Sequence, residues 1–187
     1  MNRMDQALDE RLLFPFRKVE TRKIFVDGYS WCTVKVLEID ESLRAHKDEA
    51  VIDALIKSPF HLWQGEQSPE GTNWVWNGKP LHVEQFGPWD RTLMTPQDYT
   101  PVLYEAAVEL LLAHHREHVS EGPEELKKME DFFREQVPAD YRLFHLSLGT
   151  TNFGERRVMN SVFDHFIAFI GIDPSTERAL IFEAGED

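Results

Sequence analysis

The sequence predicts an α+β fold, in which a mostly antiparallel sheet built from hairpins packs against about three main helices. Three observations predict it. Pairs of turn-forming residues are flanked by segments in which apolar and polar residues alternate, and apolar residues have helical spacing in three other segments. The predicted strands also follow one another as hairpins. We expect residues 1–187 to form a single domain, because a chain of this size hides roughly 70% of its unfolded surface on folding.

The chain divides into eight expected elements, with residues 150–163 left without an assignment. In order these are a short helix or ordered N-terminal arm over 1–16, a hairpin over 22–39, a helix over 45–58, a hairpin over 74–86, helices over 101–119 and 123–136, a strand over 142–148, and a hairpin over 165–183.

The first hairpin is predicted from the pair Asp27–Gly28, which suits a two-residue turn because both positions accept positive φ. That turn sets Ile24 opposite Trp31 on one face of the hairpin. Both faces are apolar, so we expect the hairpin to be covered on both sides. Cys32 lies mid-strand among apolar neighbours and is expected to be a buried structural thiol.

The helix over 45–58 and the second hairpin are also predicted from short stretches of sequence. The helix has an apolar stripe and is stopped by Ser58–Pro59. The pair Asn77–Gly78 is a strong hairpin signal, and it places Trp76 opposite Lys79.

The remaining elements are bounded by prolines and turns. Thr100 can cap a helix that opens at Pro101, and its apolar stripe is expected to be Leu103, Ala107, Leu110 and Leu111. The helix over 123–136 opens with proline, and its buried stripe is Leu126, Met129, Phe133 and Val137. The strand over 142–148 alternates, and residues 173–177 suit the turn of the last hairpin.

Charge and composition exclude several classes of protein. The formal net charge of −13 opposes nucleic-acid binding, because a phosphate backbone is repelled by an acidic surface. No window approaches the roughly 18 apolar residues of a membrane span, and the N-terminus lacks a secretory signal. A single cysteine suits a reducing compartment. We therefore expect a cytoplasmic protein that binds neither nucleic acid nor membrane, with its oligomeric state open.

A candidate metal site lies at the end of the helix over 101–119. His114 and His118 are four positions apart, and Glu121 follows on the same stripe, so three ligands can converge on one divalent ion. The residue order His-His-Arg-Glu-His differs from the His-Glu-x-x-His order of zincins. The alternative is that these residues form a solvent-exposed end of the helix. No other cofactor is predicted.

A candidate ligand site has two parts. Trp74 and Trp76 can stack on a ring-shaped ligand, with core packing as the alternative. Arg156 and Arg157 follow a loop of small residues that could present N–H groups to an anion, with an ordinary strand-ending loop as the alternative.

A candidate partner surface is the acidic segment that begins near residue 117. Its carboxylates include Glu121, Glu124, Glu125 and Asp131, and a solvated helix face is the alternative. We expect a non-catalytic acidic protein-binding module, of the inhibitor or toxin-neutralising type, that acts on a basic partner. The alternative is a small metal-dependent enzyme that uses the His114/His118 helix face, so the sequence leaves open whether the protein is an enzyme and which residues would be catalytic.

Overall fold

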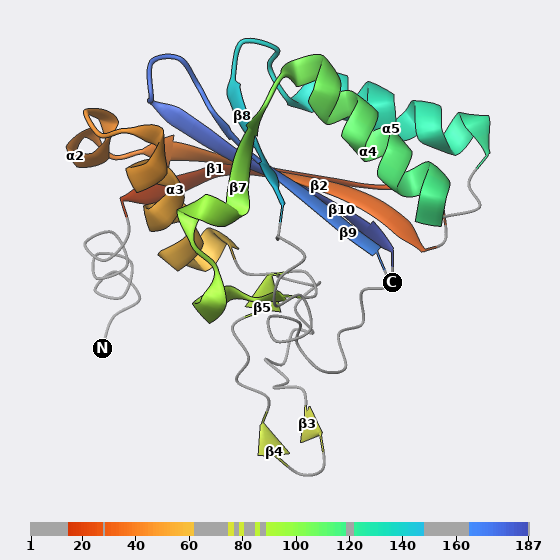
Figure 1. Cartoon of the computed structure of the whole chain (residues 1–187), viewed down its shortest axis with the longest axis horizontal. Helices are drawn as coiled ribbons and strands as arrows, with labels where there is room; N and C mark the ends of the chain where they lie inside the picture. Colours follow the sequence, from red (N-terminus) through yellow and green to blue (C-terminus); the bar gives the residue numbers. More distant parts are fainter. Residues whose placement is uncertain are drawn as a thin grey trace.

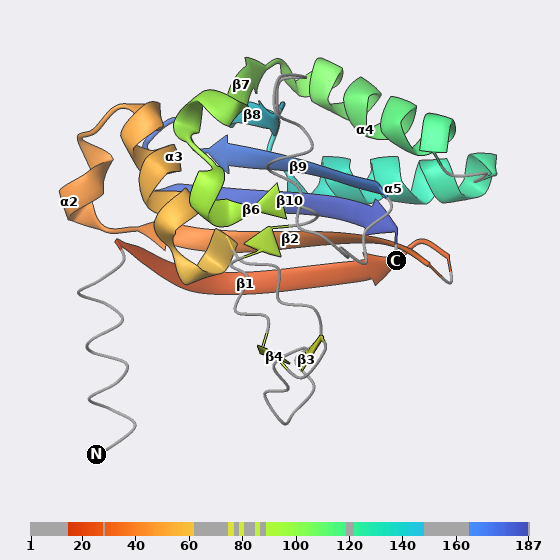
Figure 2. The ribbon, with the colours of Figure 1, turned by 60° about the horizontal axis from the view of Figure 1, so that its bottom comes forward.

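The core of the protein is a six-stranded sheet in which every neighbouring pair of strands is antiparallel (Figure 1). The computed structural model describes residues 15–27, 29–61, 75–76, 79–80, 85–86, 89–118, 122–147 and 165–186. The strand order is β1-β2-β10-β9-β8-β7, and Figure 2 shows it from β7 at the top to β1 at the bottom. The strands are β1 (Phe16–Phe25), β2 (Ser30–Ile39), β7 (Tyr99–Val102), β8 (Arg142–Leu146), β9 (His165–Ile172) and β10 (Arg178–Glu186).

Helices cover both faces of this sheet, so the predicted α+β fold is confirmed. One face packs against α2 (Glu41–Arg44), α3 (Asp48–Lys57) and the short helices η1 (Pro59–His61), η2 (Arg91–Leu93) and η3 (Pro96–Asp98). The other face packs against α4 (Tyr104–His118) and α5 (Pro123–Gln136), which lie side by side. Two small two-stranded ladders, β3 (Val75–Trp76) with β4 (Lys79–Pro80) and β5 (Gln85–Phe86) with β6 (Trp89–Asp90), complete the described elements.

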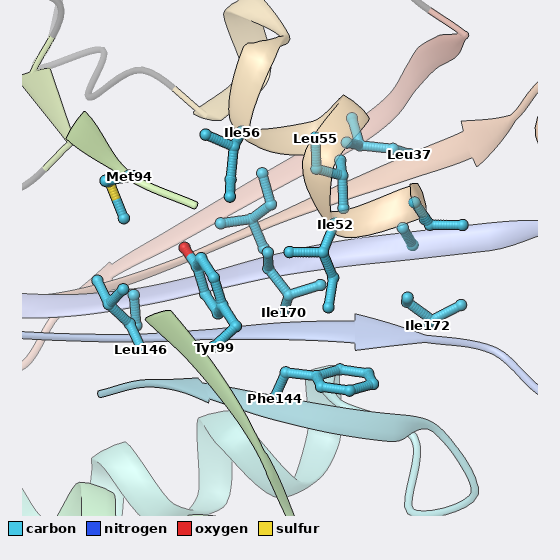
Figure 3. Close-up of a cluster of buried hydrophobic side chains, with 14 of the residues drawn as sticks. Leu37, Ile52, Leu55, Ile56, Met94, Tyr99, Phe144, Leu146, Ile170 and Ile172 are labelled. Atoms are coloured by element: carbon cyan, nitrogen blue, oxygen red, sulfur yellow. The ribbon is translucent and has the colours of Figure 1, made fainter. Parts of the chain in front are cut away.

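Each face of the sheet has its own apolar core. On the α3 face, Leu55 and Ile52 of α3 pack with Ile170 and Ile172 of β9, and the Tyr99 ring lies beside Leu146 (Figure 3). On the α4–α5 face, the largest fully buried side chains are Phe133, Phe169, Phe182, Leu111 and Met129. The central strands β2, β9 and β10 are therefore buried on both sides, as predicted for β2, but the predicted cover of the first hairpin is wrong for β1, whose residues Arg17–Lys23 are exposed.

The register of the first hairpin differs from the prediction by one residue. Phe25 lies opposite Trp31 and Ile24 opposite Cys32, because the turn has three residues and closes with Val26 N donating to Ser30 O at 2.8 Å. The side chain of Asp27 accepts from the backbone N–H groups of Tyr29 and Ser30 at 2.6 and 2.7 Å, which stabilises the longer turn. Since side chains alternate along a strand, this shift exchanges the two faces of β1 relative to β2. Cys32 is fully buried in the α4–α5 core, as expected.

The predicted helix over 101–119 begins later and buries a different face. Residues Tyr99–Val102 pair with β8 as the edge strand β7, in which Pro101 is tolerated because the strand is at the sheet edge. Of the four predicted stripe residues, Ala107 and Leu111 are buried, while Leu103 and Leu110 are exposed. The buried face of α4 comprises Ala107, Val108, Leu111, Leu112 and His115.

The other predicted elements agree more closely with the structure. The helix predicted over 45–58 is α3, which spans Asp48–Lys57, and the short helix α2 with its N-cap Asp40 precedes it. Helix α5, the strand β8 and the hairpin β9–β10 occupy the predicted segments, although β8 ends at Leu146 and β10 continues to Glu186. In the second hairpin, Trp76 lies opposite Lys79 as predicted, and the expected element over 1–16 lies almost wholly outside the described residues. No described helix is long and apolar enough to span a membrane.

Candidate functional site

The most unusual chemistry in the structure is an ion pair buried on the α3 face of the sheet. Lys35 lies on β2 and Glu183 on the neighbouring strand β10, where Lys35 is opposite Ile181 and Glu183 is opposite Thr33. This diagonal placement brings Lys35 Nζ to 2.5 Å from Glu183 Oε1, with 7% and 2% of the two residues exposed. Lys35 Nζ also donates to the carbonyl of Phe60 at 3.2 Å. A charge buried this deeply is tolerated only with such partners.

A second buried pair, His61 and Tyr99, lies near this ion pair. His61 ends η1 and Tyr99 begins β7, and His61 Nε2 is 2.6 Å from Tyr99 Oη. The His61 ring stacks on Phe86, with ring centroids 3.7 Å apart. Arg91 holds the chain before His61 in place by donating to the carbonyls of Ile56 and Ser58 at 3.1 and 2.7 Å. We call Lys35, Glu183, His61 and Tyr99 the polar cluster.

Burial controls the protonation of the polar cluster. It raises the pKa of Glu183, and the Lys35 ammonium opposes that shift. Burial, and then the positive charges of Lys35 and Arg91, lower the pKa of His61 well below its usual value. Burial also raises the pKa of the Tyr99 phenol well above its usual value, with a further contribution from the Glu183 carboxylate. At neutral pH the cluster therefore holds a neutral imidazole, a neutral phenol and an ion pair.

Groups of this kind can exchange protons with one another, but nothing described brings a substrate to them. A surface depression of about 480 Å³ is lined by residues of the α2–α3 loop, α3 and η3, and it includes no member of the polar cluster. Its lining residues are His46, Lys47, Glu49, Ala50, Asp53, Pro96 and Gln97. Within the described ranges, no group of three or more His, Cys, Asp and Glu side chains could hold a metal ion. The polar cluster is thus buried and lies apart from this depression, and its His61 Nδ1 is a buried atom without a hydrogen-bond partner among the described residues.

Acidification is expected to destabilise the protein through His61. A histidine whose pKa is lowered in the folded state binds its proton more readily in the unfolded state, so stability is full above about pH 6.5 and falls as the pH falls below that value. One such group contributes a slope of up to about 1.4 kcal/mol per pH unit. Urea unfolding measured from pH 7.5 to 5 checks this, and His61→Gln is expected to reduce the slope.

The matched control for this experiment is His46→Gln. His46 is exposed, so its replacement is expected to leave the slope unchanged. The half-buried His145, whose pKa burial also lowers, contributes in the same direction and remains in both variants. Equal slopes for His61→Gln and the natural sequence would contradict this account of the polar cluster.

Of the predicted metal residues, the structure describes the side chain of His114 alone. His114 is half-buried, and its ring lies near those of His115 and His165, with centroids 5.5 and 6.2 Å away. His115, and not His114, lies on the buried face of α4, where its Nδ1 donates to the Leu111 carbonyl at 3.0 Å. The side chain of His118 and all of Glu121 lie outside the described residues, so the predicted site stays a prediction.

The acidic residues predicted to bind a partner differ in whether a cation of the same helix pairs with them. Glu124 is exposed on the first turn of α5, and Glu125 is half-buried beside it. Asp131 accepts from Lys127 Nζ at 2.8 and 2.9 Å, so its charge is balanced within the helix. Such exposed pairs contribute little to stability and also lower the negative charge of the surface.

The predicted ligand residues cannot be placed together. Trp74, Arg156 and Arg157 lie outside the described residues, and of Trp76 only the backbone pairing with Lys79 is described. The stacking site and the anion-binding loop therefore stay predictions.

The polar cluster itself was missed by the sequence analysis, although two of its members have a detectable signal. Lys35 stands between Val34 and Val36, and Glu183 between Phe182 and Ala184. A charge inside an apolar strand that is covered on both sides must be buried with a partner. His61 and Tyr99 have no such signal, because their contact depends on the placement of η1 against β7.

Comparison of the chain with protein-family models, with curated proteins and with solved structures finds no match. The function must therefore be argued from the arrangement of residues alone.

Proposed function

We propose that the protein is a non-catalytic protein-binding module, of the inhibitor or toxin-neutralising type, that docks a basic partner on the outer surface of α4 and α5. The single observation that supports it most is the exposure of Leu103 and Leu110, which are 81% and 38% exposed. Leu103 directly precedes α4 and Leu110 lies within it, so both belong to the exposed surface of this segment. Protein interfaces combine an apolar centre of this kind with a polar rim.

The same two helices carry exposed carboxylates. Glu109 and Glu117 of α4 and Glu124 and Glu135 of α5 are exposed, and none of them forms an ion pair within the described part of the chain. The nearby cations Lys127 and Arg134 are already paired with acidic residues of the two helices, which are Glu105, Glu130 and Asp131. The net field of the layer is negative, and it favours a basic partner by accelerating the encounter.

Charge reversal on this surface is expected to abolish partner binding. The variant Glu109→Arg/Glu117→Arg/Glu124→Arg removes three exposed carboxylates and adds three cations without touching either core. Because like charges across an interface repel, we expect capture of a basic protein from lysate to fall at least about tenfold, read by quantitative mass spectrometry. With the purified partner, association is expected to slow as salt is raised.

The control for net charge is Glu41→Arg/Glu49→Arg/Glu177→Arg, which makes the same change at exposed positions outside the helix layer. We expect this variant to capture the partner as well as the natural sequence does. Equal losses in both triple variants would mean that only overall charge matters, and no loss in the first would remove α4 and α5 from the interface. The metal-dependent alternative depends on His114, His118 and Glu121 and is tested separately by elemental analysis.

A further inference from the structure

The edge strand β1 differs from every other strand of the main sheet in its exposure. Among the described strands it pairs with β2 alone, and its seven consecutive residues Arg17–Lys23 are all exposed, whereas β2 is buried almost throughout. The helix layers reach β1 only near its two ends, where Phe16 is buried in the α3-face core and Lys128 of α5 donates to the Phe25 carbonyl, and Figure 2 shows β1 as the outermost arrow of the sheet. An edge strand of ten residues presents a row of unpaired N–H and C=O groups on its outer side.

The charge of β1 is opposite to that of the protein. The strand has four cations and one carboxylate, in a chain whose net charge is −13. The cations form two pairs, Arg17–Lys18 and Arg22–Lys23, so that each face of the strand presents one arginine or lysine at each end. Arg17 is bonded to Glu38 and Arg22 to Glu20, while Lys18 has no ion pair among the described residues.

Apolar side chains accompany these charges. Val19 and Phe25 of β1 and Tyr29 of the turn are 51%, 52% and 68% exposed. Lys23 Nζ lies over the Phe25 ring, 4.5 Å from its centroid, and this contact orients the lysine at the end of the strand. The outer edge thus offers hydrogen bonds, apolar contacts and positive charge along one line.

Three central registers are unfavourable for the pairing of this edge with a second copy of the chain. In a regular antiparallel pairing about a two-fold axis between Glu20 and Thr21, Lys18 lies opposite Lys23. An axis between Val19 and Glu20 places Arg17 opposite Arg22. An axis at Glu20 places Lys18 opposite Arg22. These three registers set like charges against each other, which destabilises the pair, whereas an axis at Thr21 places Glu20 opposite Arg22 and opposes no like charges.

We infer that β1 binds an extended acidic segment of a partner protein by antiparallel strand addition. The backbone of such a segment satisfies the outer N–H and C=O groups of β1, and its carboxylates lie opposite the two cation pairs. Neutral apolar strands are expected to pair poorly with this edge, because a bulge lies between Lys18 and Glu20 and cations flank it. Edge strands with bulges and charges resist non-specific pairing. This interface is separate from the acidic helix layer and uses the opposite charge.

The test uses a labelled ten-residue peptide in which two Glu-Glu pairs flank a Val-Thr-Val centre, with the full-length protein. We expect fluorescence anisotropy to detect binding and hydrogen exchange to slow at residues 17–25. Lys18→Glu/Lys23→Glu is expected to weaken binding at least about tenfold, because two favourable cross-strand pairs become repulsive. The control Lys47→Glu/Lys57→Glu changes the same charge outside β1 and is expected to bind normally.

Two further peptides separate strand addition from simple attraction of charge. A version with Gln in place of Glu is expected to bind at least about tenfold more weakly, and so is an acidic version with Pro at its centre, which cannot complete the ladder. Equal binding of the Pro peptide, no protection of residues 17–25, or a stable dimer that buries β1 would each overturn the inference. If Lys18→Glu/Lys23→Glu does not fold, Lys18→Gln/Lys23→Gln gives the same comparison without charge reversal.

Discussion

Replacing either member of the Lys35–Glu183 pair by an apolar residue is expected to destabilise the protein by about 3–5 kcal/mol. Lys35→Met leaves the Glu183 carboxylate in a site that is 2% exposed, and Glu183→Leu leaves the ammonium equally isolated. A buried charge without its partner retains its desolvation cost and loses its compensation. Urea unfolding of each variant, monitored by circular dichroism at pH 7, measures the change.

The double variant Lys35→Met/Glu183→Leu is the informative member of this cycle. It removes both charges together, so its stability is expected to equal or exceed that of the natural sequence. Lys57→Met serves as a surface control, because Lys57 pairs with Asp53 at 2.6 Å but is 69% exposed, and its loss is expected to cost no more than about 0.5 kcal/mol. If the double variant is as unstable as the less stable single variant, the pair contributes to the free energy of unfolding by more than the neutralisation of one charge by the other.

Truncation of Leu111 is expected to destabilise the protein by about 2–5 kcal/mol, whereas truncation of its neighbour Leu110 is expected to change stability by no more than about 0.5 kcal/mol. Leu111 is fully buried in the α4–α5 core, and Leu110 is 38% exposed. Leu111→Ala therefore leaves a cavity among packed side chains, and Leu110→Ala leaves only solvent. Chemical unfolding of the two variants under identical conditions measures both values.

This pair of variants also tests which face of α4 is buried. The spacing of the sequence assigns both leucines to one apolar stripe, and equal losses would support that assignment against the structure. Leu110→Ala has a second use, because a variant of normal stability can be examined for partner binding. Reduced capture of the basic partner by Leu110→Ala is the result that the proposed interface requires.

Much of the fold could be predicted because its signals are local. The helix over 123–136 follows from Pro123 and a regular apolar stripe, and the hairpin of β9 and β10 follows from apolar strands around a five-residue turn. Both signals lie within segments of fewer than about 25 residues, where periodicity and turn chemistry decide the structure. The α+β class followed from these elements without any knowledge of how they pack.

The failures of prediction have a common physical cause, which is tertiary contact. Pro101 is an ordinary first residue of a helix, but its segment pairs with β8 at the sheet edge, and this pairing delays the helix to Tyr104. The Asp27 side chain adds a residue to the first turn and shifts the register of β1. His61 and Tyr99 meet only because η1 and β7 cover one region of the sheet, and no spacing in the sequence encodes that meeting.

The position of β10 between β2 and β9 has a consequence for how the protein is made. The side chains of Lys35 and Glu183 are in contact across 148 positions of sequence, so the pairing at the centre of the sheet joins distant parts of the chain. Closing so long a loop is costly in entropy and slow. During synthesis, β2 leaves the ribosome roughly 10–30 s before β10 does, at ordinary rates of elongation. Throughout that interval the edge of β2 that pairs with β10 is uncovered, which exposes the nascent β1–β2 hairpin to chaperones.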